Sequence, residues 1–190
     1  MSANDWAPVT EIRHDARLVE AAREGDRAAF GVLYGRYSRM VHGILLARVP
    51  WAEVDDLVQD VFLQAMRRLH TLREAAAFGG WLAMITRNRA NDYHRRTPET
   101  IELSEDLEGQ SAEQVPAQAE ALRALEVIRG LPESYRETLI LRLVEGLTGP
   151  EIAERTGLTA DSVRVNLHRG MKQLREKLGS GERDPKGGSS

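Results

Sequence analysis

Cysteine is missing from the 190-residue sequence, and its absence excludes disulfides, thiol catalysis and zinc sites built on cysteine. Long apolar runs are missing too, since none approaches the roughly 18 residues that a membrane span needs. The N-terminus has no basic segment followed by an apolar one, as a secretory signal would. We therefore expect a cytoplasmic protein.

Positive charge is missing from one segment of the chain. Between Pro98 and Leu122 there are seven acidic residues and neither lysine nor arginine. The whole chain has a net charge of −3, but without those seven residues it has 26 basic and 22 acidic residues, a net charge of +4. A basic body with an acidic connector permits nucleic-acid binding.

Strand-like alternation of apolar and polar residues is also missing, whereas helical periodicity runs through most of the chain. The pattern predicts helices from Asp26 to Pro50, over 53–69 and over 78–96, where Thr97-Pro98 ends the third. We expect an all-α fold of two small helical domains joined by a flexible acidic linker. The predicted segments are an N-terminal tail (1–14), a first domain (15–97), the linker (98–116), a second domain (117–178) and a disordered tail (179–190).

The second domain contains the pattern of a helix-turn-helix. Thr148 can cap a short helix with Pro150 in its first turn, and Gly157 can adopt the positive φ of a tight turn. Thr159 can cap a long helix that ends near Leu178. This spacing is typical of a DNA-reading unit whose second helix enters a major groove.

Polar and basic side chains occupy the outward face of that last helix. Arginine and lysine can bind phosphates, asparagine can read adenine, and valine can contact a thymine methyl group. The alternative is a solvated amphipathic helix without specific contacts. The candidate duplex-binding residues are Arg164, Val165, Asn166, His168, Arg169 and Lys172.

Two helices of the first domain also have notable polar faces. The helix at 53–69 turns carboxylates and amides outward, which by charge alone is a solvated face. The helix at 78–96 interleaves cations, amides and aromatics, which suits single-stranded nucleic acid because aromatics stack on bases while cations follow the backbone. A basic helix end stabilised by the helix dipole explains the same charges equally well.

Two motif sets in this order resemble the extracytoplasmic-function (ECF, group 4) sigma factors of the sigma-70 family. Asp55-Asp56-Leu57-Val58-Gln59-Asp60-Val61-Phe62, followed by Phe78-x-x-Trp81-Leu82-x-x-Ile85-x-x-Asn88-x-x-x-Asp92, resembles sigma region 2. The chain from Leu131-Pro132 through the helix-turn-helix resembles sigma region 4. Gly149 and Asn166 depart from the family pattern, which often has an aromatic residue and an arginine at these positions.

The resemblance implies a non-enzymatic sigma factor without cofactor, metal or catalytic residue, which directs promoter-specific initiation by bacterial core RNA polymerase. Region 4 would read the −35 element as duplex DNA, and region 2 would recognise and melt the −10 element, with the segment from Leu72 to Phe78 taking part. An anti-sigma factor is an expected further partner. The implied polymerase-binding residues are Asp55, Asp56, Gln59 and Asp60. The implied −10 residues are Trp81, Arg87, Asn88, Asn91, Asp92, Arg95 and Arg96.

Two other functions fit part of the sequence. A free-standing helix-turn-helix regulator accounts for residues 148–178 but leaves the first domain and the linker without a purpose. A small helical hydrolase would need Asp55, Asp56 and Asp60 to gather a divalent cation, yet the five histidines are dispersed and form no ligand spacing with carboxylates.

Overall fold

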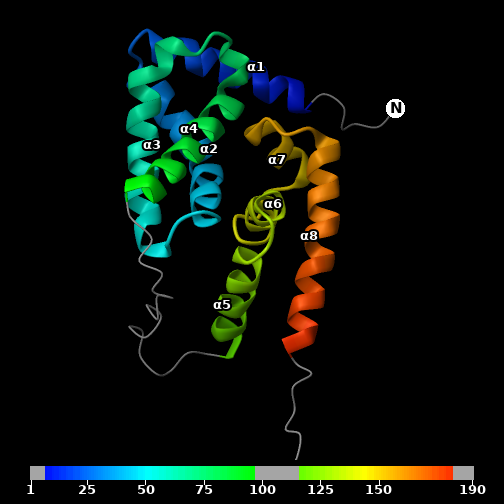
Figure 1. The fold of residues 1–190 in the computed structure, drawn as a ribbon. Helices are drawn as coiled ribbons and strands as arrows, with labels where there is room; N and C mark the ends of the chain where they lie inside the picture. The colour runs from blue at the N-terminus through cyan, green and yellow to red at the C-terminus, as the bar shows by residue number, and fades with distance from the viewer. Residues whose placement is uncertain (1–6, 97–115, 182–190) are drawn as a thin grey trace, which may run out of the picture.

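The structure, a computed structural model, describes residues 7–96 and 116–181, and these form eight α-helices and three short 3-10 helices (Figure 1). The predicted linker lies outside the described residues except for Pro116. In chain order the elements are α1 (Ala7–Arg23), α2 (Arg27–Leu46), η1 (Trp51–Glu53), α3 (Val54–Arg68), η2 (Leu69–Thr71), η3 (Ala75–Ala77), α4 (Phe78–Arg96), α5 (Pro116–Arg129), α6 (Glu133–Leu143), α7 (Gly149–Thr156) and α8 (Ala160–Gly181).

Helices α1–α4 form the N-terminal helical unit, and its local signals act as predicted. The Asp26 carboxylate accepts the backbone N–H groups of Ala28 and Ala29 and so begins α2. The apolar stripe of α3 is buried along its whole length. Helical periodicity predicts that Tyr34 shares the apolar face of α2 with Phe30 and Leu33. The structure leaves 41% of Tyr34 exposed, although its ring packs 4.4 Å from that of Phe62.

Helix α1 corrects the predicted tail, because it begins at Ala7 rather than after residue 14. Asp15 fixes α1 on α2. Its buried carboxylate accepts hydrogen bonds from the guanidinium group of Arg36 at 2.5 Å and from the hydroxyl of Tyr37 at 2.7 Å. Val19, fully buried, adds α1 to the core. These hydrogen bonds join residues more than 20 positions apart, so no local sequence pattern predicts them.

Helices α5–α8 form the C-terminal helical unit, and α7 and α8 are the predicted helix-turn-helix. The side chain of Thr148 and that of Glu151 cap each other's backbone at the start of α7. Gly157 has a φ of 74° in the turn, and the Thr159 hydroxyl accepts the N–H of Ser162. Helical periodicity groups Leu143 with the apolar residues Leu139 and Ile140 of α6, but Leu143 is 48% exposed.

The ends of the C-terminal helical unit differ slightly from the prediction. Helix α5 starts one residue earlier, at Pro116, and α8 continues through Gly181, so residues 179–181 are helical rather than part of a disordered tail. Residues 182–190 lie outside the described part of the chain.

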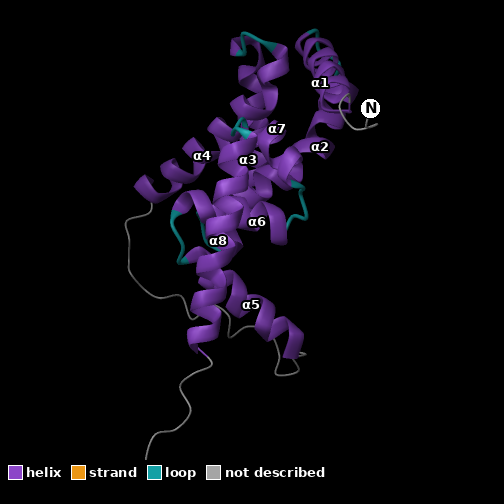
Figure 2. Cartoon of the chain, turned by 90° about the vertical axis from the view of Figure 1, so that its right-hand side faces the viewer, coloured by secondary structure: helices purple, strands orange, loops and turns teal. Residues whose placement is uncertain are grey.

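The two helical units share one hydrophobic core instead of standing apart. Buried residues from Val19 to Ala90 and from Ile128 to Leu174 belong to the same cluster. Helix α6 packs on α2, and α7 packs on α4 (Figures 1 and 2). None of the helices in the described residues is long and apolar enough to cross a membrane.

Candidate nucleic-acid interface

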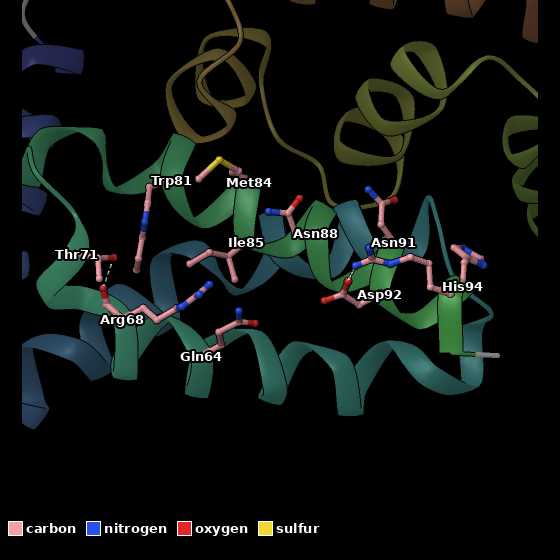
Figure 3. A pocket seen from close by; sticks show the side chains of 11 residues that line it. Gln64, Arg68, Thr71, Trp81, Met84, Ile85, Asn88, Asn91, Asp92 and His94 are labelled. Atoms are coloured by element: carbon pink, nitrogen blue, oxygen red, sulfur yellow. Dashed lines mark hydrogen bonds and ion pairs between the residues drawn. The ribbon is translucent and has the colours of Figure 1, made fainter.

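A cleft of about 630 Å³ between α3 and α4 is the first candidate site. Five of the seven predicted −10 residues line it, and Figure 3 shows Trp81, Ile85 and Asn88 of α4 facing Gln64 and Arg68 of α3. The lining residues are Gln64, Arg68, Thr71, Trp81, Met84, Ile85, Asn88, Asn91, Asp92, His94 and Arg95.

The cleft combines an aromatic wall with polar groups on both sides. The Trp81 ring lies 6.0 Å from that of buried Phe78, and buried Ile85 forms part of the floor. Arg95 forms an ion pair with Asp92, one helical turn away. An apolar surface with a few convergent polar groups suits a planar ligand that also makes hydrogen bonds. An unstacked base is such a ligand.

The sequence missed the α3 side of this cleft. Gln64 and Arg68 are four residues apart and therefore share a helix face, and this spacing is the one signal that could have grouped them. The segment after them is tied down by Arg23 of α1, which donates to the backbone carbonyls of Leu69 and Leu72. Helix α1 thus holds one rim of the cleft in place.

The remaining two predicted −10 residues lie outside the cleft lining. Arg87 turns toward the C-terminal helical unit and binds Glu137 with N–O distances of 2.7 and 3.2 Å. Arg96 is exposed at the last residue of α4. Burial opposes ionisation of Glu137, but the hydrogen bonds from Arg87 and the charges of Arg48 and Arg87 outweigh it and lower the pKa of this carboxyl.

The outward face of α3 is the second candidate site. Asp55, Asp56, Gln59 and Asp60 are all exposed, as predicted. Leu63, at 49% exposure, lies on the same face, three residues beyond Asp60. Asp60 is already paired, because Arg89 of α4 donates to it at 2.5 Å.

The outward face of α8 is the third candidate site. The predicted residues Arg164, Val165, His168, Arg169 and Lys172 are exposed there. Arg164 pairs with Asp161 at 3.1 Å, and Lys172 lies 4.0 Å from Glu176. Exposed pairs of this kind contribute little and can exchange for phosphate. Asn166 is half-buried and lines a second cavity, between the two helical units.

Gly170 is a further α8 residue that sequence reasoning missed. A Cβ atom built there would lie 3.1 Å from two carbon atoms of Leu139 and 3.2 Å from the Cβ of Tyr135. Glycine therefore sets how closely α8 crosses α6. Among the described residues, no group of three or more histidine or acidic side chains is arranged to hold a metal ion.

These features define the class: a two-part helical protein with a helix-turn-helix and a separate cleft suited to an unpaired base. The sequence pattern of sigma-70 region 2 matches residues 33–98, and that of sigma-70 region 4 matches residues 121–174. The chain belongs to the ECF sigma factors of the sigma-70 family, which direct RNA polymerase to promoters.

Two curated relatives and one solved structure illustrate the likeness. The ECF RNA polymerase sigma-E factor of Haemophilus influenzae is 31% identical, across 86% of this chain and 95% of the relative. That of Escherichia coli K12 is 32% identical, across 90% and 97%. CnrH, solved in complex with the cytosolic domain of CnrY, is 26% identical with a TM-score of 0.61, across 87% of this chain and 97% of CnrH.

Proposed function

We propose that the cleft between α3 and α4 captures an unstacked base of the −10 element during promoter melting. The observation that carries this proposal is the convergence of Trp81, Asn88, Asn91, Asp92 and Arg95 on one cavity. Trp81 supplies a stacking surface, and the amide groups supply donors and acceptors for a base edge. Residues 15–97 would form this −10 module, and residues 117–178 the −35 module.

The outward face of α3 docks on core RNA polymerase in this proposal. Its carboxylates provide charge, and exposed Leu63, one turn further along the same face, provides an apolar contact. An apolar contact bordered by polar groups is a common arrangement in protein interfaces. Arg169 and its neighbours on α8 would then read the −35 duplex.

The chain acts here by binding alone, with no catalysis of its own, in the compartment that contains polymerase and DNA. A protein that restrains it is a reasonable further partner, because the similar CnrH was solved with the cytosolic domain of CnrY. We propose an anti-sigma factor that covers the polymerase-facing or DNA-facing surfaces of both helical units.

Reconstituted transcription tests the cleft. Core polymerase with Trp81→Ala should bind a promoter as duplex but open it poorly, with a loss of about 1–3 kcal/mol for one stacked base. Trp81→Phe should retain part of the activity because it keeps a ring. Trp51→Ala is the matched control, since Trp51 is 62% exposed and lies outside the cleft lining. Normal opening by Trp81→Ala would remove the base-capture role.

A further inference from the structure

The segment that follows α3 forms one end of the cleft between α3 and α4, and it has little regular structure of its own. Residues 69–77 consist of the short 3-10 helices η2 and η3, joined by extended backbone at Leu72 and Glu74. Thr71 lines the cleft, and Figure 3 shows it beside Arg68 and the ring of Trp81. The position of this segment therefore sets the shape of the cleft at that end.

Arg23, the last residue of α1, binds the backbone of this segment at two points. Its Nε atom donates to the carbonyl oxygen of Leu69 at 3.3 Å, and its Nη2 atom donates to that of Leu72. Thr71 lies between these two residues in the chain. A guanidinium group has its donors in a fixed plane, so it sets the positions of both carbonyls relative to each other. Hydrogen bonds from such a charged donor are also stronger than neutral ones.

The guanidinium group of Arg23 is itself held in one orientation. Its Nη1 atom donates to both carboxylate oxygens of Glu20, at 2.8 and 2.9 Å. A cation in the last turn of a helix is favourable for the helix dipole alone. That interaction needs no contact with Leu69 and Leu72, which are 46 and 49 residues further along the chain. The two hydrogen bonds to their carbonyls therefore indicate a second role for Arg23.

Helix α1 can act as a fixed support for the segment because α2 holds it in place. Asp15 bonds α1 to α2, and Val19 is fully buried in the core. Helix α1 also packs directly on η3, so it contacts the segment on both sides of Leu72. A shift of the segment would have to break the hydrogen bonds of Arg23 and the packing of η3 against α1.

We propose that Arg23 is a positioning residue for −10 recognition. Its guanidinium group fixes the backbone of residues 69–72 and thereby holds Thr71 at the edge of the cleft that receives the base. Arg23 acts through this segment and makes no contact with DNA. The inference rests on the proposed function of the cleft, whereas the hold on the segment rests on the two hydrogen bonds alone.

Hydrogen–deuterium exchange tests whether Arg23 holds the segment. Arg23→Met removes the donors but keeps an unbranched side chain, so amide exchange in residues 70–77 should become about tenfold faster. Arg23→Lys should give an intermediate rate, because an ammonium group cannot span both carbonyls as a guanidinium group does. Arg17→Met, an exposed change on the same helix with the same loss of charge, is the matched control and should leave this exchange unchanged. Equal exchange in the parent and Arg23→Met would overturn the proposal.

Reconstituted transcription tests whether the hold on the segment serves recognition. Core polymerase with Arg23→Met should open a promoter that the parent opens about tenfold less well, while binding of the protein to polymerase stays unchanged. Arg23→Lys should restore part of the opening, and Arg17→Met should open normally. Circular dichroism at the assay temperature checks that every variant is folded. Normal opening by Arg23→Met, where Trp81→Ala fails, would overturn the positioning role and leave base capture standing.

A double-substitution cycle with Trp81 separates positioning from a general loss of stability. If Arg23 acts through the cleft, Arg23→Met should reduce opening less in a Trp81→Ala background than in the parent. Additive losses would show that Arg23 acts elsewhere and would overturn the proposal. Normal opening by both single variants would refute base capture itself, and with it any role of Arg23 in −10 recognition, whatever the exchange rates show.

Discussion

Gly170 offers a sharp test of how the recognition helix is positioned. In Gly170→Ala the new methyl group would lie 3.1–3.2 Å from carbon atoms of Leu139 and Tyr135, which is closer than ordinary van der Waals contact. Relieving that contact requires these neighbours, or α8 itself, to shift by a few tenths of an ångström. Small-to-large changes in a packed contact cost about 1–3 kcal/mol.

Helix propensity acts in the opposite direction, so the sign depends on the size of each effect. Replacing glycine by alanine within a helix contributes about 0.8–1.0 kcal/mol. The net effect at Gly170 is therefore a loss of about 0–2 kcal/mol. Gly35→Ala on α2 is the matched control, because nothing lies within 4 Å of its Cβ position. That variant should gain the full propensity, about 1 kcal/mol.

Thermal unfolding followed by circular dichroism distinguishes the two variants. At about 2–4 °C per kcal/mol, Gly35→Ala should unfold a few degrees above the parent, and Gly170→Ala at or below it. Binding of −35 duplex by the polymerase complex should weaken only in Gly170→Ala, since Arg169 is adjacent to the displaced residue. If both variants gain equal stability, the close crossing of α6 and α8 does not constrain the helix-turn-helix.

Three further predictions concern single side chains. Asp60→Arg should abolish binding to core polymerase in a pull-down while lowering stability by less than about 1 kcal/mol, because the exposed ion pair with Arg89 contributes little; retained binding would remove the α3 face from the interface. Arg169→Ala should weaken −35-dependent transcription by about 1–3 kcal/mol, and no change on any promoter would contradict its role. The hydrogen bond to Glu145 raises the pKa of His42 above its usual 6.5, against burial and with help from the carboxylates of Glu145 and Asp55. Protonated His42 therefore stabilises the folded state; this contribution to the free energy of unfolding is complete below pH ~6.5 and disappears as pH rises through the raised pKa of His42. Unfolding free energies at pH 6 and 8 should differ more in the parent than in His42→Gln, and equal differences would contradict the linkage.

Local signals were sufficient for most of the helices. Caps, breakers and apolar stripes act within a few residues, so Asp26, Thr148 and Gly157 could be assigned from their neighbours alone. The cleft was half predictable for the same reason. Asn88 and Asp92 share a face of α4 by spacing, whereas the facing residues of α3 depend on how the two helices pack.

Contacts between distant parts of the chain could not be predicted in this way. Arg87 is grouped with the −10 residues by position on its helix, but its partner Glu137 is 50 residues away. Leu143 fits a core stripe by period, yet α6 ends where that face meets solvent. Nothing in the sequence around Gly170 indicates its role, because that role depends on how closely α6 crosses α8.

The position of Arg87 places a requirement on the proposed mechanism. A guanidinium group that makes two hydrogen bonds to Glu137 cannot give the same donors to a DNA phosphate or base. Any DNA contact by Arg87 must therefore replace Glu137, whose buried carboxylate then keeps Arg48 as its ion-pair partner. The ion pair of Arg87 with Glu137 and the proposed DNA contact of Arg87 therefore exclude each other at any one moment.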